Sequence, residues 1–272
     1  MYADLHIHSI YSDGRLTPGE IAKYARAVGL KAVSLTDHDT VKGIDDMLNH
    51  GRKNDILVIP GIELSTEYNN EEIHILGYFI NHKAQNLDGK LQQLRHLKIE
   101  RTEKMAYNLK RIYGIDILKE LAQVKKTTHT LGRPHLARIL VDKGIVSSMA
   151  DAFEKYLNED CPAYVDRKRM TPQEGVRLIK EAEGLPVLAH PGLIKRDIDV
   201  MVIMKQGLEG MEVFHAKHTK EVQQRLEQMC LANKWVITGG SDCHGDRLRG
   251  RLIMGCAGLE KKYFQALLQY NQ

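Results

Sequence analysis

The sequence predicts an α/β protein with a largely parallel sheet and one separate helical insertion. Three observations support this fold class: short β-rich apolar segments recur along the chain, amphipathic helical segments alternate with them, and one long central stretch contains helical patterns only. Apolar strands that alternate with helices are typical of parallel sheets, whose two faces are both covered. The predicted strands are residues 3–8, 31–38, 56–65, 72–79, 185–191, 210–214 and 235–244.

Two of the predicted helices have clear starting signals. In residues 17–29, Thr17 is a candidate N-cap, Pro18 occupies the first helical position, and Glu20 completes a capping box. Residues 171–184 repeat this pattern, and a glycine ends each segment. Each helix leads into a predicted strand, as expected for strand–helix–strand units.

The stretch of residues 87–166 has long helical patterns and no convincing strand. The chain is long enough for one large α/β domain or for a domain that carries an inserted subdomain. We therefore expect residues 1–86 and 167–272 to form the barrel that carries the site, and residues 87–166 to form a helical insertion that covers it.

The bulk composition excludes few functions. The chain has 39 Lys and Arg residues against 35 Asp and Glu, and this net charge of +4 suits an anionic substrate without requiring a nucleic-acid partner. The four cysteines form no C-x-x-C pair, so neither a zinc ribbon nor a redox dithiol is indicated. Because there is no signal-peptide pattern and no apolar run near the roughly 20 residues of a membrane span, we expect a cytoplasmic protein.

The first predicted strand carries an unusual pair of imidazoles. Alternation places Leu5 and Ile7 on one face, and Asp4, His6 and His8 on the other. A single histidine at such a position is most simply a hydrogen-bonded core residue. Two histidines that point the same way from one strand instead indicate a binding site.

Further polar residues fall within or at the ends of the other predicted strands. In a parallel barrel the carboxyl ends of the strands meet on one face, where active sites form. Burying many titratable groups without a compensating charge is costly, and bound metal ions would supply that charge. Imidazole and carboxylate ligands without thiolates suit Mn, Fe or Zn. The residues concerned are His6, His8, Asp37, His38, Glu63, His74, His190, Asp242 and His244.

Each of these residues, taken alone, has a structural alternative. His74 could be a hydrogen-bonded core histidine, and His190 before Pro191 could simply end a strand. Asp37 and Asp39 could be helix N-caps, and we keep that interpretation for Asp39. Only the convergence of all the residues on one face favours the metal site.

Together these motifs resemble the polymerase and histidinol phosphatase (PHP) superfamily. The shared features are H-x-H near the start, then SDG, TDHDT, G-x-E-x-S, AHP and SDCH, with GRPHLAR in the insertion, so the resemblance extends over nearly the whole chain. The chain most resembles the stand-alone branch that includes 3′,5′-nucleoside bisphosphate phosphatases and enzymes that trim RNA from 5′ to 3′. The resemblance implies a distorted (β/α)7 barrel with two or three divalent transition metal ions.

The resemblance also implies a ligand for each ion. His6, His8 and Asp242 would bind one metal ion, and Glu63 would bridge it to a second. Many members of the superfamily have a histidine at the position of Asp13. The stand-alone branch that this chain most resembles has an aspartate there, as this chain does. The second ion would be completed by His74 and His190, and a third would be bound by Asp13, His38 and His244.

Catalytic roles are implied for Glu63, Asp13 and His218, and His218 would also contact the substrate. Arg133 and His135 in GRPHLAR are candidate substrate-binding residues, because the planar guanidinium of arginine matches phosphate oxygens. The alternative is that Arg133 is a solvated residue at the start of a helix.

Three other features have weaker signals. His215 could merely pack in the interior. The charge runs 166–169 and 246–251 are of a kind that is usually solvated, although an arginine of the second run could contact a phosphate that is not cleaved.

We therefore expect a metal-dependent phosphoesterase that removes the 3′-phosphate of small nucleoside 3′,5′-bisphosphates and also trims short RNA with 5′-phosphates. One alternative is a histidinol-phosphate phosphatase, against which the GRPHLAR insertion argues. Another is a non-catalytic PHP module like those attached to bacterial replicative polymerases, which the intact ligand set and the absence of a polymerase segment before Gln272 disfavour. We expect neither a membrane nor an obligate protein partner.

Overall fold

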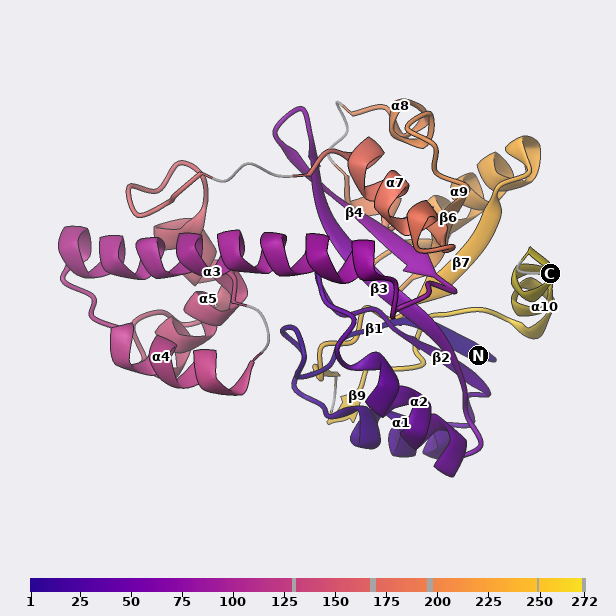
Figure 1. The fold of residues 1–272 in the computed structure, drawn as a ribbon, viewed down its shortest axis with the longest axis horizontal. Coiled ribbons are helices and arrows are strands. Elements are labelled where there is room, and N and C mark those ends of the chain that lie inside the picture. Colours follow the sequence, from indigo (N-terminus) through magenta and orange to yellow (C-terminus); the bar gives the residue numbers. More distant parts are fainter. Residues whose placement is uncertain (129–130, 167–169, 195–197, 249, 271–272) are drawn as a thin grey trace. The chain divides into compact units, whose positions relative to one another are not determined.

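The computed structural model describes residues 1–272 except 129–130, 167–169, 195–197, 249 and 271–272 (Figure 1). The chain divides into two compact units. We call them the barrel unit, Met1–Gly89 with Arg169–Gln272, and the helical unit, Lys90–Lys168.

The barrel unit contains the seven strands that the sequence predicts, in one sheet and in chain order. They are β1 (Ala3–Ile7), β2 (Ala32–Leu35), β3 (Leu57–Tyr68), β4 (Glu71–Tyr78), β5 (Leu185–Leu188), β6 (Gly210–His215) and β7 (Val236–Gly240). The pairs β1–β2, β2–β3, β5–β6 and β6–β7 are parallel, whereas β4 is antiparallel to both β3 and β5. The sheet is therefore largely parallel, as predicted, with one reversed strand.

A two-residue turn explains why β4 is reversed. Asn69 and Asn70 connect β3 to β4, and their φ angles are both positive, 50° and 62°. Two successive left-handed residues characterise the type I′ turn, a tight connection that asparagine tolerates well and that makes its two strands antiparallel. The Asn-Asn pair is visible in the sequence and is the signal for this hairpin.

The first and last strands meet and nearly close the sheet into a barrel. The N–H of His8 donates a hydrogen bond to the carbonyl of Cys243 (3.0 Å), and Ile7 forms a parallel bridge with the same residue. Gly240 lies so close to β1 that a Cβ atom there would stand 2.3 Å from Cβ of His6. Only glycine therefore fits at this point of closure.

Two helices of the barrel unit, α1 (Pro18–Ala27) and α7 (Pro172–Glu181), begin where the capping signals predict. Thr17 and Thr171 each accept the N–H of the glutamate three residues later, at 3.3 and 3.2 Å, and each glutamate accepts the threonine N–H at 2.8 Å. Both predicted capping boxes are thus confirmed. The remaining elements of the unit are α2 (Ile44–Lys53), the 3-10 turn Pro191–Leu193, α8 (Val200–Met204), α9 (Lys220–Asn233), α10 (Lys261–Tyr270) and the hairpin strands β8 (Arg247–Leu248) and β9 (Arg251–Leu252).

The expected N-cap role of Asp39 is wrong. Its carboxylate accepts hydrogen bonds from the N–H and the hydroxyl of Ser65, at 2.9 and 3.1 Å, and so ties the segment after β2 to β3. Helix α2 instead has Gly43 as its N-cap, without a side-chain hydrogen bond. A capping aspartate and a cross-strand aspartate have the same sequence signal, and the parallel pairing of β2 with β3 decides between them.

The helical unit has its own apolar core and, within residues 90–128 and 131–166, no strand. Met105, Leu109, Leu136 and Leu140 are fully buried in this core. Among the residues that the structure describes, no helix has the length and apolar character needed to cross a membrane. The helices here are α3 (Gln85–Tyr113), α4 (Leu118–Thr127), α5 (Arg133–Asp142), α6 (Met149–Ala152) and the π-helical turn Phe153–Leu157.

A pair of glycine substitutions tests the closure of the barrel. We expect Gly240→Ala to lower the free energy of unfolding by about 1–3 kcal/mol, because the added methyl group must push β1 away from β7. Gly89→Ala is the matched control: Gly89 lies in α3 with no atom near its missing Cβ, so alanine should raise the free energy of unfolding by about 0.5–1 kcal/mol. Urea unfolding of both variants measures the difference, and equal stabilities would contradict the tight closure.

Candidate metal centre

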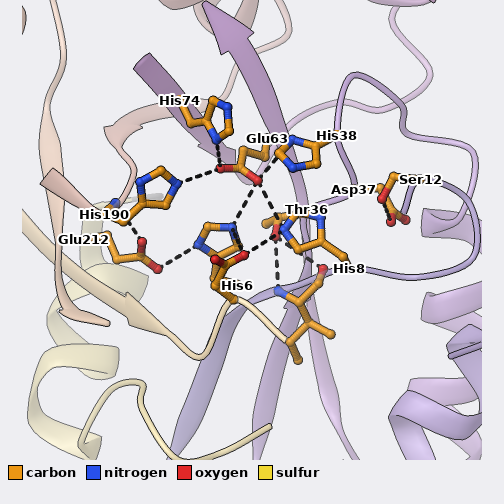
Figure 2. Close-up of polar contacts among 12 residues, drawn as sticks. His6, His8, Ser12, Thr36, Asp37, His38, Glu63, His74, His190 and Glu212 are labelled. Carbon is orange, nitrogen blue, oxygen red and sulfur yellow. Dashed lines mark hydrogen bonds and ion pairs between the residues drawn. The ribbon is translucent and has the colours of Figure 1, made fainter. Parts of the chain in front are cut away.

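All nine predicted metal ligands lie in one connected cluster of side chains in the barrel unit, and Figure 2 shows the part of it around Glu63. Every histidine of the cluster has a ring nitrogen within 3.5 Å of a carboxylate oxygen of another member. Every carboxylate likewise has an oxygen within 3.5 Å of a histidine nitrogen. The strands that supply these residues are far apart in the sequence, and the barrel brings them together. The members are His6, His8, Asp13, His38, Glu63, His74, His190, Asp242 and His244.

Glu63 of β3 occupies the middle of this cluster and is fully buried. One oxygen, Oε2, lies 3.2 Å from Nε2 of His6 and 3.2 Å from Nε2 of His8, and it also lies 3.3 Å from Nδ1 of His38. The other oxygen, Oε1, lies 2.8 Å from Nδ1 of His74 and 3.2 Å from Nε2 of His190. A single carboxylate thus faces five imidazoles, which suits a group that bridges two cations.

Three groups of potential ligand atoms occur in the cluster, each with all its atoms within 4.8 Å of one another. Their shared residues are Glu63, His8 and His38, so the three groups form one continuous centre. His190 lies outside these groups but contacts Glu63. The groups are His6, His8, Glu63 and Asp242; His38, Glu63 and His74; and His8, Asp13, His38 and His244.

The reversed direction of β4 determines how His74 reaches the centre. The expectation that polar residues converge because all strands run parallel does not hold for this residue. His74 lies near the start of β4 and pairs with Ser65 near the end of β3. Because β4 runs backwards, its first half lies beside the carboxyl ends of its neighbours, so His74 joins the cluster.

Two of the ligand residues have a left-handed backbone. The φ angles of Asp242 and His190 are 55° and 29°. Such conformations cost of order 1–3 kcal/mol for residues other than glycine and are concentrated at functional sites. The chain therefore keeps two unfavourable backbone conformations at the points where strands β5 and β7 give way to loops that carry ligands.

The donor set fits divalent transition metals. Among the described residues, neither ring nitrogen of His8 makes a hydrogen bond of normal geometry, nor does Nδ1 of His38, although all are buried. Buried polar atoms normally have hydrogen-bond partners, so nitrogens of this kind fit a site that binds a cation. Imidazole nitrogen and carboxylate oxygen together, without thiolate, suit Mn, Fe or Zn. Cys243 packs in an apolar cluster with Ile7, away from the ligands.

Charges within the cluster compensate one another. Burial alone would raise the pKa of Glu63, but the surrounding imidazoles hold it well below its usual range. Burial would lower the pKa of His8, whereas the carboxylates of Asp242 and Glu63 raise it to about 10. For His38, burial dominates and lowers the pKa to about 4. Protons on some imidazoles thus balance the carboxylates in the metal-free protein, and metal ions would displace those protons.

His218 and His215 lie beside the cluster, in the turn after β6 and at its end. Nδ1 of His218 donates to the carbonyl of Val213 (2.9 Å), and its Nε2 accepts the N–H of Gly192 (3.1 Å). Both ring nitrogens of His218 therefore form hydrogen bonds to the backbone. A catalytic or substrate-binding role for His218 stays a prediction. His215 does more than pack, since its Nε2 lies 3.5 Å from Oδ2 of Asp242.

Arg133 and His135 belong to the helical unit, at the start of α5. The guanidinium of Arg133 lies over the rings of Phe153 and Tyr164, at 5.7 and 5.8 Å from their centres. His135 is buried, and its Nδ1 accepts the N–H of Gly132 at 3.3 Å. Their role in substrate binding stays a prediction.

The structure describes little of the charge run 166–169 and most of the charge run 246–251. Most of the run 166–169 lies outside the described residues, as does residue 249 of the run 246–251. Within the second run, Arg247 donates to the carbonyl of Gly250 (2.9 Å), inside its own β8–β9 hairpin.

Sequence reasoning missed Glu212 and did not foresee the role of Asp37. Asp37 accepts hydrogen bonds from the N–H and hydroxyl of Ser9 and from the hydroxyl of Ser12, all at 2.6–2.7 Å, and so anchors the loop that leads to Asp13. Glu212 is fully buried in β6 and contacts His6 and His190. A single carboxylate inside the apolar strand GMEVF was the available signal.

A substitution at the shared carboxylate tests the centre. We expect Glu63→Gln to lose most bound metal, because the amide removes the negative charge that two ligand groups share and its nitrogen cannot bind a cation. Elemental analysis of protein purified without chelator should show at least two equivalents of transition metal in the unmodified protein and fewer in the variant. Glu221→Gln in the exposed first turn of α9 is the control and should retain the full content. Full metal content in Glu63→Gln would contradict this arrangement.

Comparison with known proteins places the chain among phosphoesterases. The chain is 30% identical over 255 residues to a 3′,5′-nucleoside bisphosphate phosphatase of Chromobacterium violaceum, which covers 91% of this chain and 89% of the relative. It is 31% identical over 252 residues to a 5′-3′ exoribonuclease of Haemophilus influenzae, covering 89% of each chain. A phosphoribosyl 1,2-cyclic phosphate 1,2-diphosphodiesterase of Eggerthella lenta is 29% identical over 258 residues, 90% of this chain and 95% of the relative.

A solved structure and a family model agree with these relatives. A Bifidobacterium adolescentis protein named as a predicted metal-dependent phosphoesterase is similar with a TM-score of 0.87 and 27% identity, over 99% of this chain and 96% of that protein. The model of the PHP domain matches residues 4–160, which carry six of the nine clustered ligands. The chain belongs to the PHP-domain family.

Proposed function

We propose that this metal-dependent PHP phosphoesterase removes the 3′-phosphate from nucleoside 3′,5′-bisphosphates and also acts on short RNA with 5′-phosphates. The observation that carries the proposal is the continuous centre of three ligand groups around Glu63. A bisphosphate phosphatase and an exoribonuclease among the relatives, each aligned over most of its length, support the choice of substrate.

The three ligand groups would hold two or three divalent ions. Bound there, such ions would lower the pKa of a water molecule and neutralise the charge on the phosphoryl group. Because this chemistry supplies the attacking oxygen, the reaction needs no serine, threonine or cysteine nucleophile. Glu63 contributes by keeping its imidazole partners at distances of 2.8–3.3 Å from a single carboxylate.

Asp13 serves as an anion in this scheme. Burial alone would raise its pKa, but His244 and His38 hold the pKa well below its usual range. Asp13 is therefore ionised at neutral pH and acts as a ligand or a proton acceptor, not as a general acid. Oδ1 of Asp13 lies 3.3 Å from Nε2 of His244. This contact keeps the carboxylate of Asp13 directed toward the centre.

A positive side chain beside the cluster favours an anionic substrate. The ammonium of Lys217 lies 3.7 Å from Oδ2 of Asp242, while its side chain is 65% exposed. An exposed ammonium on a flexible stem can turn toward a phosphate oxygen. Within the barrel unit, Lys217 is thus available to meet the phosphoryl group that is cleaved.

The second phosphate of the substrate would be held by Arg133 and His135. A phosphate that does not react can orient the substrate, and binding energy from that part of the molecule can raise kcat. Nucleoside 3′-monophosphates lack this second group and should be poorer substrates.

A substrate panel under Mn²⁺ tests the proposed function. We expect kcat/KM for adenosine 3′,5′-bisphosphate to exceed that for adenosine 3′-monophosphate at least about tenfold, which corresponds to about 1.4 kcal/mol of transition-state stabilisation. The panel also contains adenosine 5′-monophosphate, a 5′-phosphorylated oligoribonucleotide, histidinol phosphate and a phosphoribosyl 1,2-cyclic phosphate. Equal values for the bisphosphate and the 3′-monophosphate would overturn the second-phosphate contact, and a preference for histidinol phosphate or the cyclic ester would overturn the substrate class.

Substitutions of Arg133 separate substrate binding from metal binding. Arg133→Ala should lower kcat/KM for the bisphosphate about 10- to 100-fold, the cost of a charged hydrogen bond of about 1.5–3 kcal/mol, and leave the metal content unchanged. Arg133→Lys keeps the charge but loses the planar fork, so it should recover only part of the activity. Because the guanidinium also packs on two aromatic rings, circular dichroism must show that both variants are folded. Unchanged kcat/KM, or loss of metal, would contradict this role.

A further inference from the structure

Strand β6 supplies none of the predicted metal ligands, yet its side chains contact ligands on other elements. The reason is an irregularity in its pairing with β7: Glu212 pairs with Thr238 and Phe214 with Gly239, so Val213 is an extra residue. Residues three apart on a regular strand point to opposite faces. The bulge instead lets both Glu212 and His215 reach the cluster, where they contact His6 and Asp242.

Glu212 uses each of its oxygens on a different ligand residue (Figure 2). Oε1 lies 2.9 Å from Nδ1 of His6, and Oε2 accepts the backbone N–H of His190 at 2.9 Å. Because a carboxylate only accepts, the first contact requires the proton on Nδ1 of His6. The other nitrogen, Nε2, is then free to bind a cation, and it lies 3.2 Å from Glu63 and 3.5 Å from Asp242.

The second contact holds a strained backbone in place. His190 has a φ angle of 29°, and its ring lies 3.2 Å from Glu63. The hydrogen bond from its N–H to Glu212 offsets part of the cost of this conformation. His218, from the turn after β6, accepts the N–H of Gly192 two residues further along, so β6 and its turn hold the His190 loop at two points.

We propose that Glu212 is a positioning residue that orients His6 and His190 together and so holds one imidazole partner of each oxygen of Glu63. The carboxylate fixes the tautomer and rotation of one imidazole and the backbone that carries the other. Carboxylates that hold a metal-binding histidine in this way typically contribute 10- to 100-fold in metal affinity. This inference rests on the metal centre of the proposed function and does not depend on which ester is cleaved.

Glu212→Gln removes one of the two hydrogen bonds that Glu212 accepts, from His6 and from His190. The amide has nearly the same shape but only one accepting oxygen, so it can accept from His6 or from His190 and not from both. We expect Mn²⁺ and Zn²⁺ to bind at least about tenfold more weakly, measured by competition with a chromophoric chelator. Circular dichroism of the metal-free variant must show that it is folded at the temperature of the measurement.

Thr238→Val is the matched control. Thr238 pairs with Glu212 on the neighbouring strand, is fully buried, and donates to the carbonyl of Met211 (3.4 Å), and it belongs to none of the three ligand groups. This variant should lose stability and keep the metal affinity of the unmodified protein. The same loss of affinity in both variants, or unchanged affinity in Glu212→Gln, would overturn the proposal.

A measurement on the unmodified protein keeps the test independent of folding defects. In Zn²⁺-loaded protein with ¹⁵N-labelled histidine, the long-range ¹H–¹⁵N spectrum should show His6 protonated at Nδ1. Protonation at Nε2 would overturn the proposal. Because neither readout uses a substrate, failure of the substrate panel would leave this inference intact, and failure here would leave the panel's result intact.

Discussion

Glu63 is fully buried, and five imidazole nitrogens lie within 3.3 Å of its two oxygens. An isolated carboxylate in such a place would cost many kcal/mol of solvation, so it persists only with positive charge beside it. Protons on the imidazoles supply that charge in the metal-free protein, and divalent ions would supply it in the active one. The opposite charges must stay close to one another. The barrel unit therefore has to hold the histidine and carboxylate side chains of the cluster in fixed positions.

The barrel meets this requirement with features that are locally unfavourable. Asp242 and His190 keep left-handed backbone conformations, β1 and β6 each contain a register shift, and Gly240 leaves room for β1 to approach β7. Each feature would weaken a barrel that had no site to support. Strain and irregular pairing concentrate at functional sites when the surrounding structure holds them, and here closure of the sheet and the hydrogen bonds of Glu212 and Asp37 do so.

In the proposed function, metal binding and substrate selection are assigned to different residues. The ligand groups all come from the barrel unit, and the relatives that align over most of their length act on different phosphate esters. In the function that we propose, residues outside the ligand groups select the ester. Lys217 borders the cluster, and Arg133 lies in a unit with its own apolar core.

Much of this protein could be determined from the sequence alone because its signals are local. Short β-rich apolar runs marked the seven strands, and threonine and glutamate three residues apart marked two helix starts. H-x-H, the strand-end motifs and the family resemblance together marked the nine clustered residues that we predict to be metal ligands. What tertiary structure decided is which groups meet across the barrel. Alternation put Asp4 beside His6 and His8, but a register shift after Asp4 leaves its carboxylate on the N–H groups of Ser241 and Gly255. Asp39 binds Ser65 rather than a helix end. His74 reaches the site because β4 runs backwards, a reversal for which the turn at Asn69 and Asn70 is a local signal, but its contact with Glu63 forms only in the folded sheet. Glu212 has a role only because a bulge turns it toward His6, since strand pairing and register depend on long-range contacts that no short stretch of sequence encodes.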